Sequence, residues 1–272
     1  MKKQTILITG CSHGGIGYAC ANYLKSKGHQ VFASVRAPDD LEKLKNEGFD
    51  VYLIDVNNQE QIVNAFNDIL KKTNNKLDVV FNNAGFAQAG ALEDIPTRYL
   101  KEQFETNFFA VHNITRIALK VMRKQGYGKI IQHGSVLGLI SLKYRGAYNA
   151  SKYALEGMVD TMRQELNGSN IYMTILNTGP VTSNIRANSM KTIKNIEIEG
   201  SSYIQQYEKL IAGKHKKVPF NKEAIAVARV VEKILKVNKP APRYSITKFT
   251  RLAKFLKSIL PTKLLDRILN KI

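Results

Sequence analysis

Short apolar runs alternate with amphipathic stretches along roughly the first 180 residues of the chain. The apolar runs are Thr5–Thr9, His29–Val35, Val51–Ile54, Leu77–Phe81, Lys129–Gln132 and Ile171–Leu176. The stretches between them place apolar residues on one helix face, as Ile62, Phe66 and Ile69 do. A strand that returns through a helix pairs in parallel with the strand before it. The pattern therefore predicts an α/β fold with a doubly wound parallel sheet, whose ligands bind beyond the carboxyl ends of the strands.

Apolar content and cysteine usage limit the class of protein. The chain has 272 residues, of which 44% are hydrophobic, so it can bury a sizeable core. No secretory signal is recognisable, and the longest charge-free apolar stretch, Ile130–Leu142, is too short to span a bilayer. The two cysteines, Cys11 and Cys20, form neither a CxxC pair nor a disulfide pattern. We therefore expect a cytoplasmic location and no metal site.

A glycine-rich turn, Thr9–Gly17, lies between the first predicted strand and the first predicted helix. Glycines at such a turn let the backbone approach a pyrophosphate, while the N–H groups at the start of the helix face the anion. A flexible turn without a ligand is the alternative. In its strand-to-helix context the turn favours a dinucleotide site, formed by Gly10, Ser12, His13, Gly15, Ile16 and Gly17.

The end of the second strand indicates which dinucleotide is bound. NAD-binding folds usually place an acid there for the ribose 2′-hydroxyl, whereas an arginine suits a 2′-phosphate. Here the strand ends in Arg36, and no acid occurs before Asp39. We therefore expect NADP(H), with Arg36 donating a forked pair of hydrogen bonds to the phosphate and His13 adding a donor. The alternatives are a solvated surface arginine and an ordinary loop histidine.

Further motifs follow in a fixed order along the chain: Asn82-Asn83-Ala84-Gly85, Asn107, Ser135 and Tyr148-Asn149-Ala150-Ser151-Lys152. Together with the glycine turn, this order resembles the short-chain dehydrogenase/reductase family over roughly residues 4–185. Within that family the chain is similar to bacterial NADP-dependent aldehyde reductases and to the steroid and retinol dehydrogenase branch. The resemblance implies a Rossmann fold and an oxidoreductase that acts on a carbonyl compound or an alcohol.

The same resemblance implies that Ser135, Tyr148 and Lys152 are catalytic, with Asn107 supporting a proton relay. Tyr148 and Lys152 are four residues apart on a predicted helix and so share a face. A phenol titrates at about pH 10, and the neighbouring ammonium together with the positively charged nicotinamide ring is expected to lower the pKa of Tyr148. Tyr148 can then exchange a proton with the substrate oxygen, while the Ser135 hydroxyl holds the developing oxyanion.

The resemblance also implies further cofactor contacts. These are Asp55 and Val56 after the third strand, Asn83, Ala84 and Gly85 after the fourth, Pro180, Val181 and Ser183 after the sixth, and Tyr148 and Lys152 themselves. Ser183 stands where the family usually has threonine, and it keeps a hydroxyl for the carboxamide. The glycine turn is one residue longer than the usual TGxxxGxG, and either Gly14 or Gly15 is the insertion.

The walls of the substrate pocket are expected from 86–91, 136–144 and 183–220, which are largely apolar. They favour a hydrophobic aldehyde, ketone or alcohol. One alternative is a hydroxysteroid- or retinol-type dehydrogenase. A second is a reductase of an anionic acyl-lipid precursor, because 186–222 is basic. A third is a scaffold that senses NADP(H) without turnover, which a broken Ser/Tyr/Lys set would have indicated.

The formal net charge is +19, and the excess is unevenly placed. Segment 239–272 holds nine Lys/Arg and one acid. No nucleic-acid motif accompanies it, so we expect no nucleic-acid partner. We expect one domain over 1–247, with an insertion at 183–220, and a basic amphipathic helical extension over 248–272.

The extension has one apolar arc, which contains Phe249, Leu252, Ala253, Phe255, Leu256, Ile259 and Leu260. Such an arc packs on the body or at an oligomer interface, or it lies on an anionic membrane. We expect packing, and a homo-oligomer; reversible peripheral membrane contact is the alternative.

Overall fold

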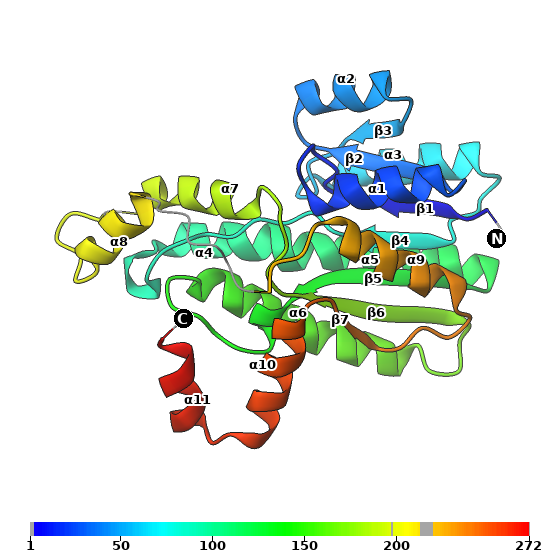
Figure 1. The fold of residues 1–272 in the computed structure, drawn as a ribbon. Coiled ribbons are helices and arrows are strands. Elements are labelled where there is room, and N and C mark those ends of the chain that lie inside the picture. The colour runs from blue at the N-terminus through cyan, green and yellow to red at the C-terminus, as the bar shows by residue number, and fades with distance from the viewer. Residues whose placement is uncertain (1–2, 197, 213–219, 272) are drawn as a thin grey trace.

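The structure is a computed structural model that describes residues 3–196, 198–212 and 220–271. Seven parallel strands form one sheet in the order β3-β2-β1-β4-β5-β6-β7 (Figure 1). The strands are β1 (Thr5–Ile8), β2 (Gln30–Val35), β3 (Asp50–Leu53), β4 (Val79–Asn82), β5 (Gly128–Ser135), β6 (Ile171–Thr178) and β7 (Arg243–Ser245). The predicted doubly wound parallel sheet is confirmed, and its order reverses between β1 and β4.

Helices cover both faces of the sheet and build two apolar cores. One face packs against α1 (Ile16–Ser26), α2 (Pro38–Asn46) and α9 (Ile225–Lys236), and the other against α3 (Gln59–Lys72), α5 (Ala110–Gln125) and α6 (Gly146–Glu165). Leu24 and Val231 are fully buried on the first face, and Phe66 and Leu155 are buried on the second. Because strands buried on both faces need apolar side chains throughout, β1 and β4 read as continuous apolar runs.

The insertion predicted at 183–220 lies over the carboxyl ends of the strands. It contains α7 (Ile185–Lys191), the turn η4 (Thr192–Asn195) and α8 (Ile204–Ile211), while residues 197 and 213–219 lie outside the described part of the chain (Figure 1). Tyr207 of α8 is fully buried; its hydroxyl donates to Asp94 at 2.6 Å and accepts from the Ala91 N–H at 2.7 Å. The insertion is therefore fastened to the loop that follows β4.

The C-terminal extension forms α10 (Lys248–Ile259) and α11 (Thr262–Leu269), which project from the body beside the last strand (Figure 1). One part of the predicted apolar arc is buried, and the other part is exposed. Ala253 is buried and Phe249 packs against it, whereas Leu252, Phe255 and Ile259 are exposed. The outer half of the arc therefore does not pack on the body of this chain, and its packing at an oligomer interface stays a prediction. Among the described residues, no helix is long and apolar enough to cross a bilayer.

Candidate active site

The three residues predicted to be catalytic lie together at the carboxyl end of β5 and the first turns of α6. Ser135 is the last residue of β5, and its Oγ accepts a hydrogen bond from the Leu137 N–H at 3.1 Å. Lys152 is buried, and its Nζ donates to the His133 carbonyl at 2.6 Å. The same Nζ lies 5.5 Å from the centre of the Tyr148 ring. The helical spacing of Tyr148 and Lys152 thus places a cation beside the phenol, as expected.

Burial has the largest effect on the pKa values of Tyr148 and Lys152 in the protein alone. It raises the pKa of Tyr148 to about 12, although the neighbouring Ser135 hydroxyl opposes the shift. Burial also lowers the pKa of Lys152 to about 8, against the raising effect of Glu156. The lowering of the Tyr148 pKa that is expected from the Lys152 ammonium together with the positively charged nicotinamide ring stays a prediction, because desolvation of the phenolate is the largest effect in the protein alone.

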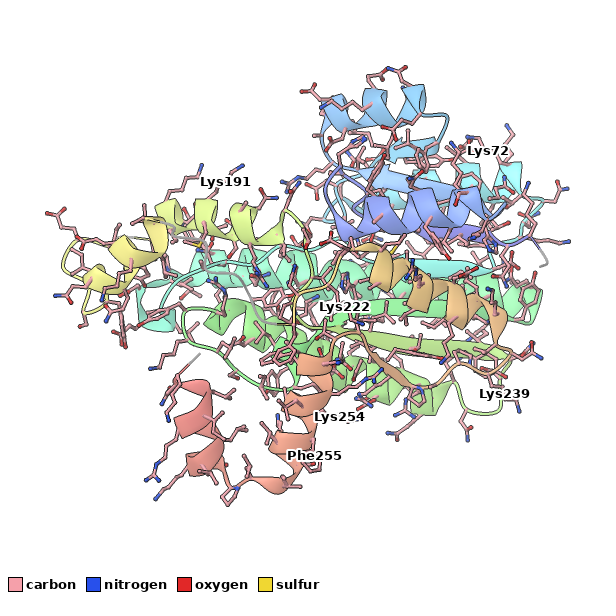
Figure 2. The ribbon with its side chains drawn as sticks, viewed as in Figure 1. Lys72, Lys191, Lys222, Lys239, Lys254 and Phe255 are labelled. Atoms are coloured by element: carbon pink, nitrogen blue, oxygen red, sulfur yellow. The ribbon has the colours of Figure 1, made fainter. Side chains whose placement is uncertain are left out.

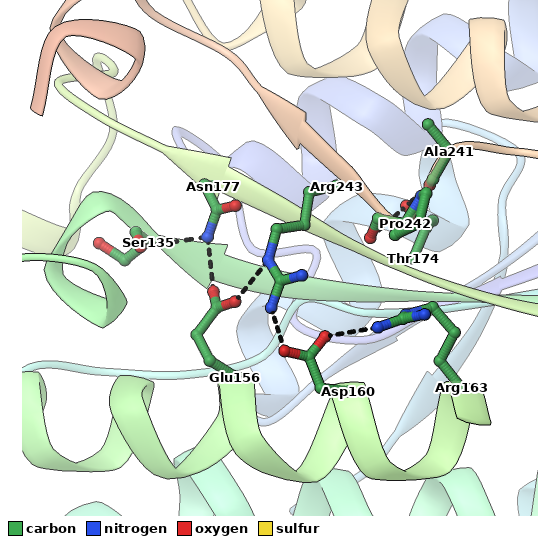
Figure 3. A network of polar contacts seen from close by, with 9 residues as sticks. All are labelled: Ser135, Glu156, Asp160, Arg163, Thr174, Asn177, Ala241, Pro242 and Arg243. Atoms are coloured by element: carbon green, nitrogen blue, oxygen red, sulfur yellow. Dashed lines mark hydrogen bonds and ion pairs between the residues drawn. The ribbon is translucent and has the colours of Figure 1, made fainter. Parts of the chain in front are cut away.

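A polar network joins α6 to β5, β6 and β7, beginning at Glu156, one helical turn after Lys152 (Figure 3). Glu156, one turn further along, accepts from Asn177 Nδ2 and pairs with Arg243 of β7 at 3.1 Å. Arg243 also binds Asp160, one turn beyond Glu156. Asn177 in turn donates to the Ser135 carbonyl. The strand that carries the serine and the helix that carries the tyrosine are therefore joined by one buried set of hydrogen bonds.

Asn107 lies in a π-helical turn, η2 (Glu105–Phe109), between α4 (Thr97–Phe104) and α5. Single π-helical turns inside α-helices are frequent at functional sites. Asn107 is fully buried; its amide exchanges two hydrogen bonds with the backbone of Phe86 and donates to Ser151 Oγ at 3.3 Å. Its side chain therefore ties the loop after β4 to α6, and its part in a proton relay remains a prediction.

Sequence reasoning missed His133, the residue two before Ser135. His133 Nδ1 lies 2.8 Å from Asn83 Oδ1, and its Nε2 lies 3.2 Å from Thr178 Oγ1. Asn83 Nδ2 already donates to the carbonyls of Thr9 and Gly10, so its oxygen must accept and His133 must carry its proton on Nδ1. Burial, aided by Lys152, lowers the pKa of His133 to about 3, so the ring is neutral. These hydrogen bonds join the ends of β1, β4, β5 and β6. We call Asn83, His133 and Thr178, together with the carbonyls of Thr9 and Gly10, the His133 belt.

The glycine turn is shaped by close backbone contacts. Gly10 has a φ of 71°, and a Cβ there would lie 2.8 Å from the Ala84 Cα. A Cβ at Gly17 would lie 2.3 Å from the Gly10 carbonyl oxygen. Gly15 is the N-cap of α1, and Gly14, with a φ of 72°, precedes it. Gly14 thus adopts the left-handed conformation that favours glycine, and which of Gly14 and Gly15 is the additional residue stays a prediction.

Donors at the turn remain available for an anionic ligand. No side chain caps the N-terminus of α1, so its first N–H groups have no capping acceptor among the described residues. The buried Ser183 Oγ and His13 Nδ1 likewise lack a hydrogen-bond partner within the described part of the chain. Buried polar atoms without partners are uncommon. The donors near the turn therefore fit a phosphate-bearing cofactor that also reaches the loop after β6.

The remaining predicted cofactor residues lie at neighbouring strand ends. Arg36 is exposed at the end of β2. His13 is only half-buried, and its Nε2 lies 2.6 Å from Glu47 Oε1, so Glu47 competes for this donor. Asp55 uses one carboxylate oxygen to accept from the Asn57 N–H, and Val56 beside it is buried.

The predicted pocket walls meet above this edge. Gly90 donates its N–H to the Tyr144 carbonyl at 3.1 Å, which joins the loop after β4 to the one before α6. Ile193 and Ile196 of the insertion share an apolar cluster with Ala89 and Ala147. The loop after β4, Tyr144 and the described part of the insertion therefore pack together. That segments 86–91, 136–144 and 183–220 enclose a hydrophobic substrate stays a prediction.

The fold and this arrangement of serine, tyrosine and lysine define a class of oxidoreductase. The profile of the short chain dehydrogenase family matches residues 4–194. The chain is 37% identical over 271 residues to the uncharacterized oxidoreductase YbbO of Escherichia coli (strain K12), covering 98% of this chain and 94% of that protein. This protein belongs to the short-chain dehydrogenase family and is an oxidoreductase.

Two further comparisons place it within that family. The chain is 30% identical over 209 residues to an NADPH-dependent 1-acyldihydroxyacetone phosphate reductase of Schizosaccharomyces pombe, covering 77% of this chain and 70% of that protein. A short-chain dehydrogenase from Streptomyces avermitilis superimposes with a TM-score of 0.78 at 24% identity, covering 99% of this chain and 94% of that one. The latter similarity establishes the fold.

Proposed function

We propose that this protein is an NADP(H)-dependent oxidoreductase that transfers a hydride between the nicotinamide and a hydrophobic aldehyde or ketone, or the corresponding alcohol. The observation that carries the proposal is the placement of Ser135, Tyr148 and Lys152 at one strand end of a sheet whose glycine turn opens a helix that no described side chain caps. Either direction of reaction uses the same groups. An intact set argues against a scaffold that binds the cofactor without turnover.

Each residue of the set has a distinct task. Tyr148, with a pKa raised by burial, holds its proton at neutral pH and can give it to the oxygen of a carbonyl being reduced. The Ser135 hydroxyl, beside that phenol, donates to the same oxygen as negative charge develops. Lys152 keeps a positive charge close to the phenolate that remains. The bound nicotinamide supplies the hydride.

The cofactor is held by the residues already assigned to the strand ends. We propose that the turn from Gly10 to Gly17 binds the pyrophosphate and that Arg36 binds a 2′-phosphate. The Ser183 hydroxyl, which has no hydrogen-bond partner among the residues that the structure describes, lies in the loop after β6, where a carboxamide donor would satisfy it. Asp55, Val56 and residues 83–85 would surround the adenosine, and Pro180 and Val181 the nicotinamide.

A second candidate substrate is an acyl lipid precursor with an anionic head group. Arg145 lies three residues before Tyr148, and burial together with the nearby charge of Arg186 lowers its pKa. Two cations held near one another at the substrate loop favour an anion between them. The relative that is named for 1-acyldihydroxyacetone phosphate supports this class. An Arg186→Gln variant is expected to lose activity on a phosphorylated acyl ketone while retaining activity on an uncharged one.

We also propose a homo-oligomer and a cytoplasmic location. The thiols of Cys11 and Cys20 are both free and buried, and burial raises their pKa values, so neither is a reactive thiolate. Free thiols are typical of a reducing compartment. Size-exclusion chromatography with light scattering would measure the oligomeric state.

The function is tested by following NADPH oxidation against aliphatic, aromatic and steroid carbonyls. Wild-type protein is expected to turn over at least one class, and Tyr148→Phe is expected to lower kcat by roughly 10²–10⁴-fold. NADPH binding, followed by nicotinamide fluorescence, should survive the substitution because the lost hydroxyl is not a phosphate contact. Equal turnover by Tyr148→Phe would remove the proposed acid. A preference for NADH would overturn the assignment of Arg36.

A further inference from the structure

The outer face of the C-terminal extension carries a ridge of exposed apolar side chains. On α10 these are Leu252, Phe255 and Ile259, which are 47%, 58% and 55% exposed. On α11 they are Leu264 and Ile268, at 43% and 36%. The spacings are those of one helix face, and we call these five residues the tail ridge. Single exposed apolar residues are ordinary, but five on two successive helices form a patch.

The tail ridge cannot turn inward, because the opposite face of α10 is already fixed to the body. Thr250 is fully buried at the root of the helix, where a Cβ on Gly179 would lie 2.7 Å from its Oγ1. Further along, Lys257 Nζ donates to the Tyr153 hydroxyl at 2.9 Å, and that hydroxyl donates to the Leu139 carbonyl. The ridge is therefore held outward.

Positive charge borders the tail ridge. Lys248, Arg251 and Lys254 lie on α10, and Lys263 and Arg267 lie on α11, with Asp266 as the single acid of 239–272. Neither Arg251 nor Lys254 has a carboxylate within ion-pair distance among the described residues. Figure 2 shows Lys254 and Phe255 on the part of α10 that stands away from the sheet.

A cavity of about 530 Å³ opens between β7 and α10, at the foot of the ridge. Arg251, Lys254 and Phe255 line it, together with the hydroxyl-bearing Ser245 and Ser258. Cations and hydroxyls are donors for phosphate oxygens, and the phenyl ring of Phe255 continues from the cavity to the apolar ridge. The surface thus offers an anion site directly beside a site for hydrocarbon.

We propose that α10 and α11 dock this protein reversibly on an anionic lipid bilayer, with the tail ridge in the acyl region and the bordering lysines and arginines at the head groups. Charge complementarity carries the choice of partner. Pairing the ridge with a second copy would bring together two segments that each hold nine Lys/Arg and one acid. An anionic lipid surface instead neutralises these charges, and basic amphipathic helices bind such surfaces by both interactions.

Docking there brings the loop that follows Ser135 to the lipid surface. Phe249 and Leu269 pack against the cluster formed by Val136 and Ile140, which follow Ser135 directly in the chain. An extension seated in the head-group region therefore holds the loop next to Ser135 close to the bilayer. A lipophilic substrate could then enter without crossing bulk water. The docking itself does not depend on the proposed reaction.

The test is co-sedimentation of the full-length protein with vesicles. One set contains equal parts of phosphatidylglycerol and phosphatidylcholine, and the other contains phosphatidylcholine alone. We expect sedimentation with the anionic vesicles, little with the neutral ones, and release as salt screens the charges. Phe255→Ser/Ile259→Ser and Arg251→Gln/Lys254→Gln should each weaken binding by roughly tenfold or more.

Matched controls separate docking from general stickiness. Leu53→Ser/Ile211→Ser removes apolar side chains that are 42% and 58% exposed elsewhere, and Lys43→Gln/Lys71→Gln removes exposed charges elsewhere. Both should bind like wild type, and circular dichroism should show all four variants folded. Equal binding to neutral vesicles, equal loss in the controls, or self-association through the ridge without vesicle binding would each overturn the proposal.

Discussion

Lys152 is a buried cation whose charge depends on one carboxylate a helical turn away. Glu156 raises the pKa of Lys152, while burial lowers it to about 8. The pair Glu156–Arg243 lies on the side of α6 that faces β6 and β7, not in the substrate site. Glu156 is therefore a positioning residue, whose effect on the reaction passes through Lys152.

The prediction is that Glu156→Gln makes Lys152 lose its proton at a lower pH. Because the charged amine is needed beside Tyr148, the alkaline limb of kcat/KM should move toward neutral pH, with a loss of roughly tenfold on that side of the optimum. Asp160→Asn is the matched control, since it also removes a partner of Arg243. A purely structural role would lower activity at all pH values and leave the limb in place.

His133 makes stability depend on pH through a different buried group. Its pKa is about 3 in the folded protein against 6.5 for an unperturbed histidine, so between these values the unfolded chain binds more protons. Stability from this group is fully present above pH 6.5 and is lost as the pH falls toward 3. The unfolding free energy should therefore fall by up to about 1.4 kcal/mol per pH unit in that window.

His133→Gln should flatten that acid slope, because an amide can accept and donate in the same belt without titrating. Urea unfolding at several pH values measures it: the variant should be less stable at neutral pH and approach wild type in acid. Parallel curves for the two proteins would show that His133 does not titrate on unfolding in this window.

At the scale of elements, the buried Tyr207 hydroxyl is one of the contacts that join the insertion to the loop after β4. Tyr207→Phe would leave the Ala91 N–H without an acceptor and Asp94 Oδ2 without this donor. We expect a loss of about 1–3 kcal/mol in stability. Limited proteolysis should cut the insertion faster than in wild type, and KM should rise more than kcat falls.

Tyr203→Phe, on the same segment, is the control. Equal protease resistance in all three proteins would mean that other contacts hold the insertion.

Elements with strong periodicity were predictable, and those set by tertiary contacts were not. The six strands up to β6 have apolar runs long enough to recognise, whereas β7 has three residues and only half-buried side chains. Its place is fixed by Arg243, which reaches Glu156 and Asp160 of α6, a contact that sequence spacing does not reveal. Glu156 itself was a missed signal, since it lies four residues after Lys152 on the same helix face.

In the whole molecule, the predicted cofactor and catalytic residues lie along the carboxyl edge of the sheet. The glycine turn, Ser135, the insertion and the start of α10 all follow strand ends, as the doubly wound order dictates. The sequence predicted that these residues lie at one edge because each motif follows a recognisable strand. The His133 belt could not be predicted, because it depends on the lateral order of β1, β4, β5 and β6 in the sheet. Which half of the apolar arc in the C-terminal extension is exposed could not be predicted either, because it depends on where α10 packs against the body.

Net charge is a property of the molecule as a whole, and it predicts how the cofactor arrives. A formal charge of +19 attracts anions over the Debye length, which is about 8 Å at physiological salt. NADPH carries a phosphate that NADH lacks, so its association rate in stopped-flow fluorescence should fall more steeply with added salt. Arg36→Gln should bring the NADPH slope toward that of NADH, because the variant removes the proposed partner of that phosphate. Lys43→Gln, which removes a charge outside the site, should leave the difference between the two slopes intact. Identical slopes for the two cofactors with the wild-type protein would show that the 2′-phosphate is not sensed during association.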